Sequence, residues 1–222
     1  MTWRAVFAFG LVVMIAASIG MAVAAVEHSP GWISHPGAAT ILRKVWLALA
    51  VYAGLIVLVV AGRGHAWDVE LRFAAVFGSV AGAVEVVNIA LENWASNGAI
   101  SPAVQIAGML VLLLLWGVAA ARTARDLHRF RPGVAAAVMS AGVCMVIGVT
   151  AGFALELFIA PPLPGYIATW PEFQRSGWMD ARAFGIGNTL DSGFTHLWMG
   201  PVIAMVVGAI GAGMVRGLAH RS

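Results

Sequence analysis

Six long apolar runs constrain this chain more than any other feature. Each holds about 20 residues with almost no charge, the length that an α-helix needs to cross a hydrocarbon core of roughly 30 Å. The runs are continuous rather than alternating, which excludes an outer-membrane barrel. The sequence therefore predicts an all-α integral membrane bundle, a single polytopic domain over residues 1–222. The expected transmembrane helices cover about 6–25, 41–61, 73–94, 103–121, 132–159 and 184–215.

Composition agrees with a membrane protein and excludes several other classes. Hydrophobic residues make up 61% of the chain and charged residues 10%, against roughly 25% charged in soluble domains. The single cysteine, Cys144, lies within an apolar run, so no intrachain disulfide can form. The chain has no phosphate-binding GxxxxGK[ST] loop and no CxxCH haem motif. The lipid bilayer is the expected partner, and no nucleic-acid partner is expected.

The first apolar run has two interpretations. Arg4 precedes it, and Ala22-Val23-Ala24 resembles a signal-peptidase site, so a cleaved signal is one alternative. The run is longer than the usual apolar core of a signal peptide, about 7–15 residues. We therefore expect a retained helix.

The distribution of basic residues orients the expected bundle. The most basic segment is 122–131, and nine of the thirteen Lys and Arg residues fall on its side of the membrane, with four on the other. Basic residues are in excess on the cytoplasmic side of membrane proteins. We expect both termini to be cytoplasmic and the long proline-rich loop 160–183, between the fifth and sixth helices, to be periplasmic. The expected location is a bacterial-type inner membrane.

The sixth apolar run carries a polar stripe. Its members recur at the i, i+3, i+4, i+7, i+8 spacing of one helical face: Asn188, Asp191, Ser192, Thr195 and His196. A polar stripe on a membrane helix should face other helices or a wet cavity rather than lipid.

Three further acids, Glu85, Glu92 and Glu156, lie in or at the ends of apolar runs. A charge at mid-bilayer costs at least about 2.5–3.5 kcal/mol on insertion scales, so such residues seldom lack a role. Glu85 and Glu92 share a face of the third helix, with Asn88 close to it.

Small residues continue these acidic faces. Gly78 and Gly82 extend the face of Glu85, and Gly148 and Gly152 precede Glu156 at four-residue intervals. Small residues at such spacing permit close packing of membrane helices. We therefore expect the third and fifth helices to bring their acids close to the sixth.

The matched depths of these groups predict one shared site, open to the outside and roofed by the 160–183 loop. We expect Asp191 and Glu85 to share its cavity. Oxygen and imidazole ligands suit several divalent metals, which makes Glu85, Asp191 and His196 candidate metal ligands and a divalent metal the candidate cofactor. The full predicted ion- or substrate-binding set is Glu85, Asn88, Glu92, Glu156, Asn188, Asp191, Ser192, Thr195 and His196.

Three functions are compatible with such a site. The favoured one is binding or transport of a proton or metal cation. The second is an integral membrane enzyme, metal-assisted, that acts on a lipid or small substrate at the outer leaflet. The third is a non-catalytic subunit of a larger membrane complex, in which the polar groups only bond neighbouring helices. The sequence does not decide whether the chain is an enzyme, and a homo-oligomer is also left open.

Overall fold

The computed structural model describes residues 3–32, 37–62, 65–94 and 102–219, and within these ranges it is all-helical with no strands. Six helices are long and apolar enough to cross a membrane, which confirms the predicted six-helix membrane bundle. They are α1 (Trp3–Glu27), α2 (Gly37–Ala61), α3 (His65–Trp94), α4 (Pro102–Leu127), α5 (Phe130–Phe153) with its π-helical continuation η2 (Ala154–Ile159), and α8 (Ala181–Ala219). The short elements are η1 (Pro30–Trp32), α6 (Pro164–Ile167) and α7 (Pro171–Ser176).

The observed helices extend beyond the predicted ranges where charged residues flank the apolar runs. α3 begins at His65 rather than 73, and α4 ends at Leu127 rather than 121. Only a short break separates α4 from α5, where His128 adopts a positive φ of 52°. Hydropathy detects the apolar part of a helix, whereas long charged side chains at its ends can reach water while the backbone stays helical.

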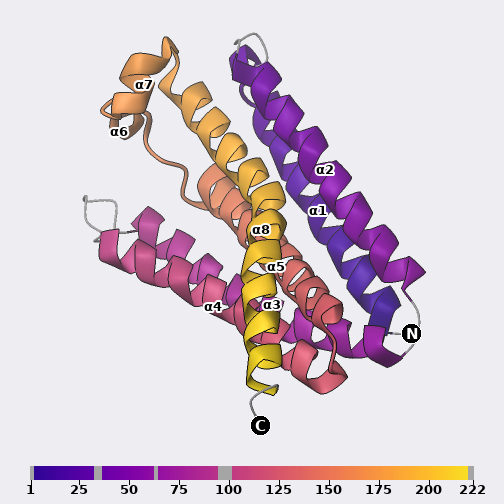
Figure 1. The fold of residues 1–222 in the computed structure, drawn as a ribbon. Helices are drawn as coiled ribbons and strands as arrows, with labels where there is room; N and C mark the ends of the chain where they lie inside the picture. Colours follow the sequence, from indigo (N-terminus) through magenta and orange to yellow (C-terminus); the bar gives the residue numbers. More distant parts are fainter. Residues whose placement is uncertain (1–2, 33–36, 63–64, 95–101, 220–222) are drawn as a thin grey trace.

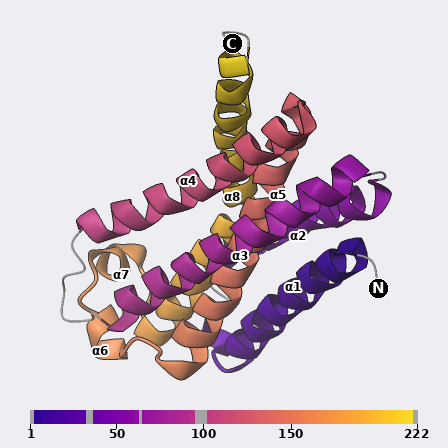
Figure 2. The same cartoon turned by 90° about the horizontal axis from the view of Figure 1, so that it is seen from below.

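α5 is the central helix of the bundle. About 61% of its apolar window is buried, against 22–28% in each of the other five long helices. It packs against α3, α4, α8 and α1, while α2 packs against α8 and α1 (Figure 1). In both views α6 and α7 lie at the end of the bundle opposite the start of α1 and the end of α8 (Figures 1 and 2). Which end faces the cytoplasm remains a prediction.

Glycines make the contact between α3 and α5 close, as their spacing predicts. A Cβ on Gly78 would lie 2.6 Å from the carbonyl oxygen of Ser140, and one on Gly148 would lie 2.7 Å from Cγ of Glu85. Real Cβ atoms essentially never approach other atoms so closely. The absence of side chains at these positions therefore lets the two helices meet, and it places Glu85 directly against α5.

Candidate functional site

A cavity of about 170 Å³ lies among α3, α5 and α8 and is open to the surface, because Glu92, Ser192 and His196 in its lining are exposed. Its described lining residues include no Lys or Arg. Three carboxylates reach it, one of them from the π-helical end of α5, together with a histidine and two hydroxyl groups of α8. These polar lining residues are Glu85, Glu92, Glu156, Thr189, Ser192 and His196. We call this space the acidic cavity.

A second cavity, of about 440 Å³, lies between α3, α4 and α8 and adjoins the first. Glu85, Glu92, Met145 and His196 line both cavities. Most other walls are apolar side chains, so we call it the lateral cavity. At its polar end Gln105 Nε2 donates a hydrogen bond of 3.4 Å to Glu92 Oε1.

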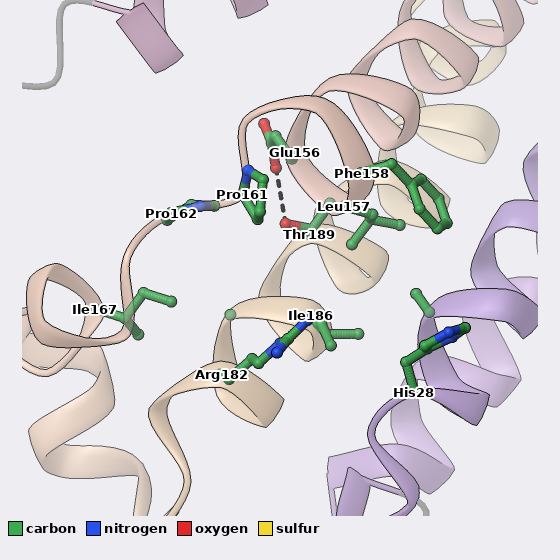
Figure 3. Close-up of a pocket in the computed structure, with 12 residues that line it drawn as sticks. His28, Glu156, Leu157, Phe158, Pro161, Pro162, Ile167, Arg182, Ile186 and Thr189 are labelled. Carbon is green, nitrogen blue, oxygen red and sulfur yellow. Dashed lines mark hydrogen bonds between the residues drawn. The ribbon is translucent and has the colours of Figure 1, made fainter.

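A third cavity, of about 320 Å³, lies next to the 160–183 loop, and we call it the outer cavity. His28 and Arg182 line it with Glu156 and Thr189 (Figure 3). Thr189 Oγ1 donates a hydrogen bond of 2.7 Å to Glu156 Oε2, and both residues also line the acidic cavity. The loop predicted to roof the site thus borders the outer cavity, and none of its described residues lines the acidic cavity.

The position of Glu156 depends on a local change of helix type. At the end of α5 the hydrogen bonding widens to a π-helix, in which Ala160 N bonds to Leu155 O at 2.7 Å. π-Helical turns inside or beside α-helices frequently occur at functional sites. The sequence predicted helix through 159 but not this change, because it depends on packing rather than on local propensity.

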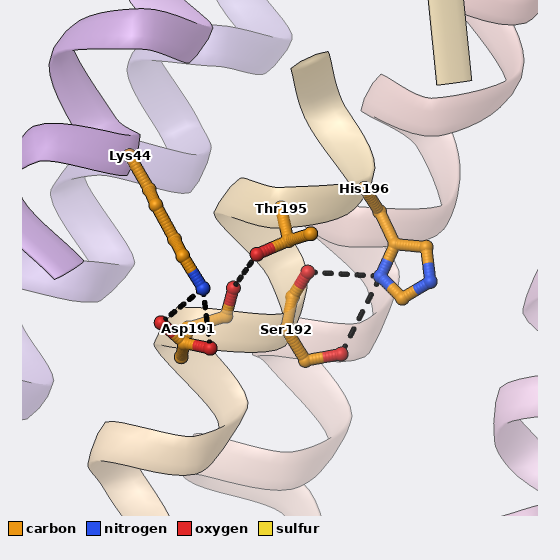
Figure 4. A network of polar contacts seen from close by, with 5 residues as sticks. All are labelled: Lys44, Asp191, Ser192, Thr195 and His196. Carbon is orange, nitrogen blue, oxygen red and sulfur yellow. Dashed lines mark hydrogen bonds and ion pairs between the residues drawn. The ribbon is translucent and has the colours of Figure 1, made fainter. Parts of the chain in front are cut away.

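His196 lines both the acidic and the lateral cavity, and one of its ring nitrogens is hydrogen-bonded within α8. Its Nδ1 lies 2.8 Å from the carbonyl oxygen of Ser192 on the preceding turn and 3.4 Å from the Ser192 hydroxyl (Figure 4). Because a carbonyl oxygen only accepts, Nδ1 carries the hydrogen, and Nε2 of the neutral ring keeps its lone pair. Figure 4 shows Nε2 on the side of the ring away from Ser192. His196 can therefore accept a proton or coordinate a cation.

Asp191 faces a different neighbour. Lys44 Nζ of α2 lies 2.6 Å and 2.7 Å from its two carboxylate oxygens, and Thr195 Oγ1 donates to its backbone carbonyl at 2.6 Å. α2 begins at Gly37, so Lys44 lies about two turns inside the helix rather than at its end. Figure 4 shows the Lys44–Asp191 pair on one side of α8 and the His196 ring on the other.

The structure thus brings together part of the predicted set. Glu85, Glu92, Glu156, Ser192 and His196 meet at the acidic cavity, and Asn88 and Thr195 line the lateral cavity beside it. Asn188 is exposed, and Asp191 lines none of the three cavities described above.

The expected metal triad of Glu85, Asp191 and His196 is not assembled. Within the described part of the chain, no group of three or more His, Cys, Asp or Glu residues is placed to hold a metal ion. Asp191 binds Lys44, whereas Glu85 and His196 line the acidic cavity on the other side of α8. The expectation that Asp191 and Glu85 share a cavity is likewise not met by the three cavities described here.

Sequence reasoning missed Lys44, Thr189 and Gln105. Nothing in the spacing of the sequence pairs Lys44 with Asp191, although an aspartate in an apolar helix signals a need for a cationic partner. Thr189 lies three residues before Ser192 and seven before His196, so helical spacing alone places it on their face.

No protein family, curated protein or solved structure matches this chain. Its class therefore rests on the fold, because six apolar helices indicate a multi-pass membrane protein. What the protein does must be argued from the cavities and the residues that line them.

Proposed function

We propose that this protein binds and passes a proton or another cation at the acidic cavity. The observation that carries the proposal is the lining of that cavity by Glu85, Glu92, Glu156 and His196, with no Lys or Arg among the described lining residues. Three carboxylates that line one cavity between apolar helices repel one another where the surroundings screen charge less than water does. A bound cation, or a proton held by one carboxylate, removes that repulsion. Ionisable groups at such positions mark ion pathways and proton relays.

The three cavities adjoin one another in series, because neighbouring cavities share lining residues. Glu156 and Thr189 line both the outer and the acidic cavity. Glu85 and His196 line both the acidic and the lateral cavity. A proton that enters beside the 160–183 loop would meet Glu156 first and then His196, whose Nε2 can accept it.

The basic residues of the sequence favour one orientation of these cavities in the membrane. The excess of basic residues on the side of 122–131 favours a cytoplasmic position for that side. The outer cavity and the 160–183 loop would then face the periplasm of a bacterial-type inner membrane.

Flux in proteoliposomes tests the proposal. The purified protein is reconstituted, a pH gradient or a potassium diffusion potential is imposed, and a pH-sensitive dye inside the vesicles records proton entry. Wild type should conduct, and Glu85→Gln and His196→Ala should reduce flux by about tenfold or more, since each removes a charge-assisted contact. Glu172→Gln is the matched control, because Glu172 is an exposed carboxylate on α7 that lines none of the three cavities described above. Wild-type protein that conducts no better than empty vesicles would contradict the proposal.

Metal analysis separates the two kinds of cation. Gently purified wild type is compared with Glu85→Gln/His196→Ala, which alters the acidic cavity, and with Asp191→Asn, which alters the opposite side of α8. Stoichiometric metal that is lost only from the first variant would assign a metal cation. Flux without bound metal in any sample would assign the proton.

A further inference from the structure

We infer that the lateral cavity binds an organic cation, a molecule with a positively charged amine head and an apolar body. This inference rests on the proposed function, because the lateral cavity adjoins the acidic cavity and shares Glu85 and His196 with it. It names the kind of molecule that occupies the larger of these two cavities. The cavity measures about 440 Å³. Small-molecule sites range over about 300–1,000 Å³, and a single inorganic ion would leave most of such a space unfilled.

The walls of the lateral cavity suit an apolar body. α4 contributes Met109, Leu112, Leu113 and Trp116, and α8 contributes Met199 and Ile203. Methionine adapts its flexible side chain to ligands of different shape, and an indole ring attracts nearby cations. Apart from the polar end described next, this lining offers few hydrogen-bonding groups.

The polar end of the cavity carries negative charge. Glu85, Glu92 and His196 line it, while Asn88 and Gln105 are neutral, and no Lys or Arg occurs among its described lining residues. Gln105 Nε2 contacts the Glu92 carboxylate at 3.4 Å. A wholly apolar occupant, such as a lipid tail, would leave these carboxylates facing hydrocarbon at high cost. A cationic head at this end and an apolar body along α4 and α8 satisfy both parts of the cavity.

The cavity is also reached from the apolar side of the bundle. Met109 and Ile203, on its rim, are exposed side chains, with 54% and 40% of their surface accessible. Amphiphilic amines concentrate in the bilayer surrounding such a rim. A lateral entrance therefore fits an occupant that partitions into lipid better than it fits a hydrated inorganic ion.

Equilibrium dialysis in a non-ionic detergent tests the inference with three ligands of nearly equal size. Benzyltrimethylammonium is the cation, neopentylbenzene is its uncharged carbon isostere, and phenylmethanesulfonate is an anion of similar shape. Saturable binding of the cation, at least about tenfold tighter than that of the other two, is expected because only its positive charge is attracted by the carboxylates and by the Trp116 ring. Equal binding of the neutral isostere would overturn the inference and indicate a lipid-like occupant, and absence of cation binding would also overturn it.

Two variants locate the bound cation. Glu85→Gln should weaken benzyltrimethylammonium binding by about tenfold, since it removes a charged partner, whereas Glu172→Gln should leave binding unchanged. Met199→Trp, which adds bulk to the apolar wall, should also weaken binding and keeps the test informative if Glu85→Gln does not fold. Unchanged binding in Met199→Trp would overturn the assignment to this cavity.

The inference and the proposed function fail in different ways. Glu85-dependent proton flux without binding of the organic cation would overturn only the inference. Cation binding that depends on Glu85, without any flux, would overturn passage of protons and keep the binding site. Absence of both would overturn both.

Discussion

Two sides of α8 border charged groups within the apolar bundle, and the partners of those groups differ between the two sides. On the side that faces α2, both carboxylate oxygens of Asp191 contact Lys44 Nζ, at 2.6 and 2.7 Å. On the side that faces α3 and α5, Thr189, Ser192 and His196 border a cavity with three carboxylates and no Lys or Arg among its described lining residues. Adjacent positions of one helix, Asp191 and Ser192, thus belong to an ion pair and to an open cavity.

The comparison shows that an acid in a membrane helix is not by itself a functional group. Asp191 belongs to the polar stripe from which the sequence predicts the site, yet it forms an ion pair with Lys44. Glu85 has Gly148 against its side chain, and its cavity leaves room for an occupant. Whether such an acid is structural or borders a cavity therefore depends on what the neighbouring helix places against it, and not on the residue type alone.

The largest expected effect separates the two sides by function. Glu156→Gln should reduce proton flux in vesicles by about tenfold or more, because Glu156 lines both the outer and the acidic cavity. The double variant Lys44→Met/Asp191→Leu removes the ion pair without leaving a lone charge. Its flux per folded protein should stay within about twofold of wild type, since no cavity group is altered. Equal losses in the two variants would show that both sides of α8 serve transport.

The next effect separates the two sides by stability. Lys44→Met leaves the Asp191 carboxylate without its partner and should lower the free energy of unfolding by about 1–3 kcal/mol. Adding Asp191→Leu should restore most of that loss, whereas His196→Ala should change it by no more than about 0.5 kcal/mol. Denaturation in mixed micelles, followed by tryptophan fluorescence, measures the three variants. A double variant that loses the sum of both single losses would argue against a coupled pair.

A smaller effect tests how α5 positions Glu85. In Gly148→Ala the new methyl group would lie 2.7 Å from Cγ of Glu85, so the carboxylate must move. Flux should fall by about three- to tenfold, because small displacements of a positioned group reduce rates steeply. Gly152→Ala is the matched control, since its methyl group would meet Ile89 at an ordinary 3.4 Å. If both alanine variants conduct like wild type, the close contact at Gly148 does not control the site.

Much of this arrangement was predictable from the sequence, because it depends on how far along its helix each residue lies and on which helices are apolar enough to cross a membrane. Apolar length predicted six membrane helices, and the glycine spacing predicted close packing beside Glu85. Matched depth on three helices brought Glu85, Glu92, Glu156 and His196 to one cavity.

The sequence could not give the rotation of each helix toward its partners. Asp191 and Ser192 are about 100° apart around the helix axis, so the polar stripe is wide enough to face two neighbours at once. That α2 packs on one side of α8 and α5 on another is a property of the bundle. The contact between Lys44 and Asp191 therefore depends on how α2 and α8 pack, and neither helix alone predicts it.

The smallest expected effect concerns the hydrogen bond between the outer and acidic cavities. Thr189→Val keeps the shape of the side chain but removes the donor that lies 2.7 Å from Glu156 Oε2. A single hydrogen bond contributes about 0.5–1.5 kcal/mol net, and one to a charged acceptor somewhat more, so flux should change by only about two- to fivefold. Thr189→Ser retains the hydroxyl and should behave like wild type in the same vesicle assay. A serine variant as impaired as valine would show that the threonine methyl group, through packing, matters more than the bond to Glu156. Thr189 would then have a structural role, like the Lys44–Asp191 pair, and would take no direct part in proton flux.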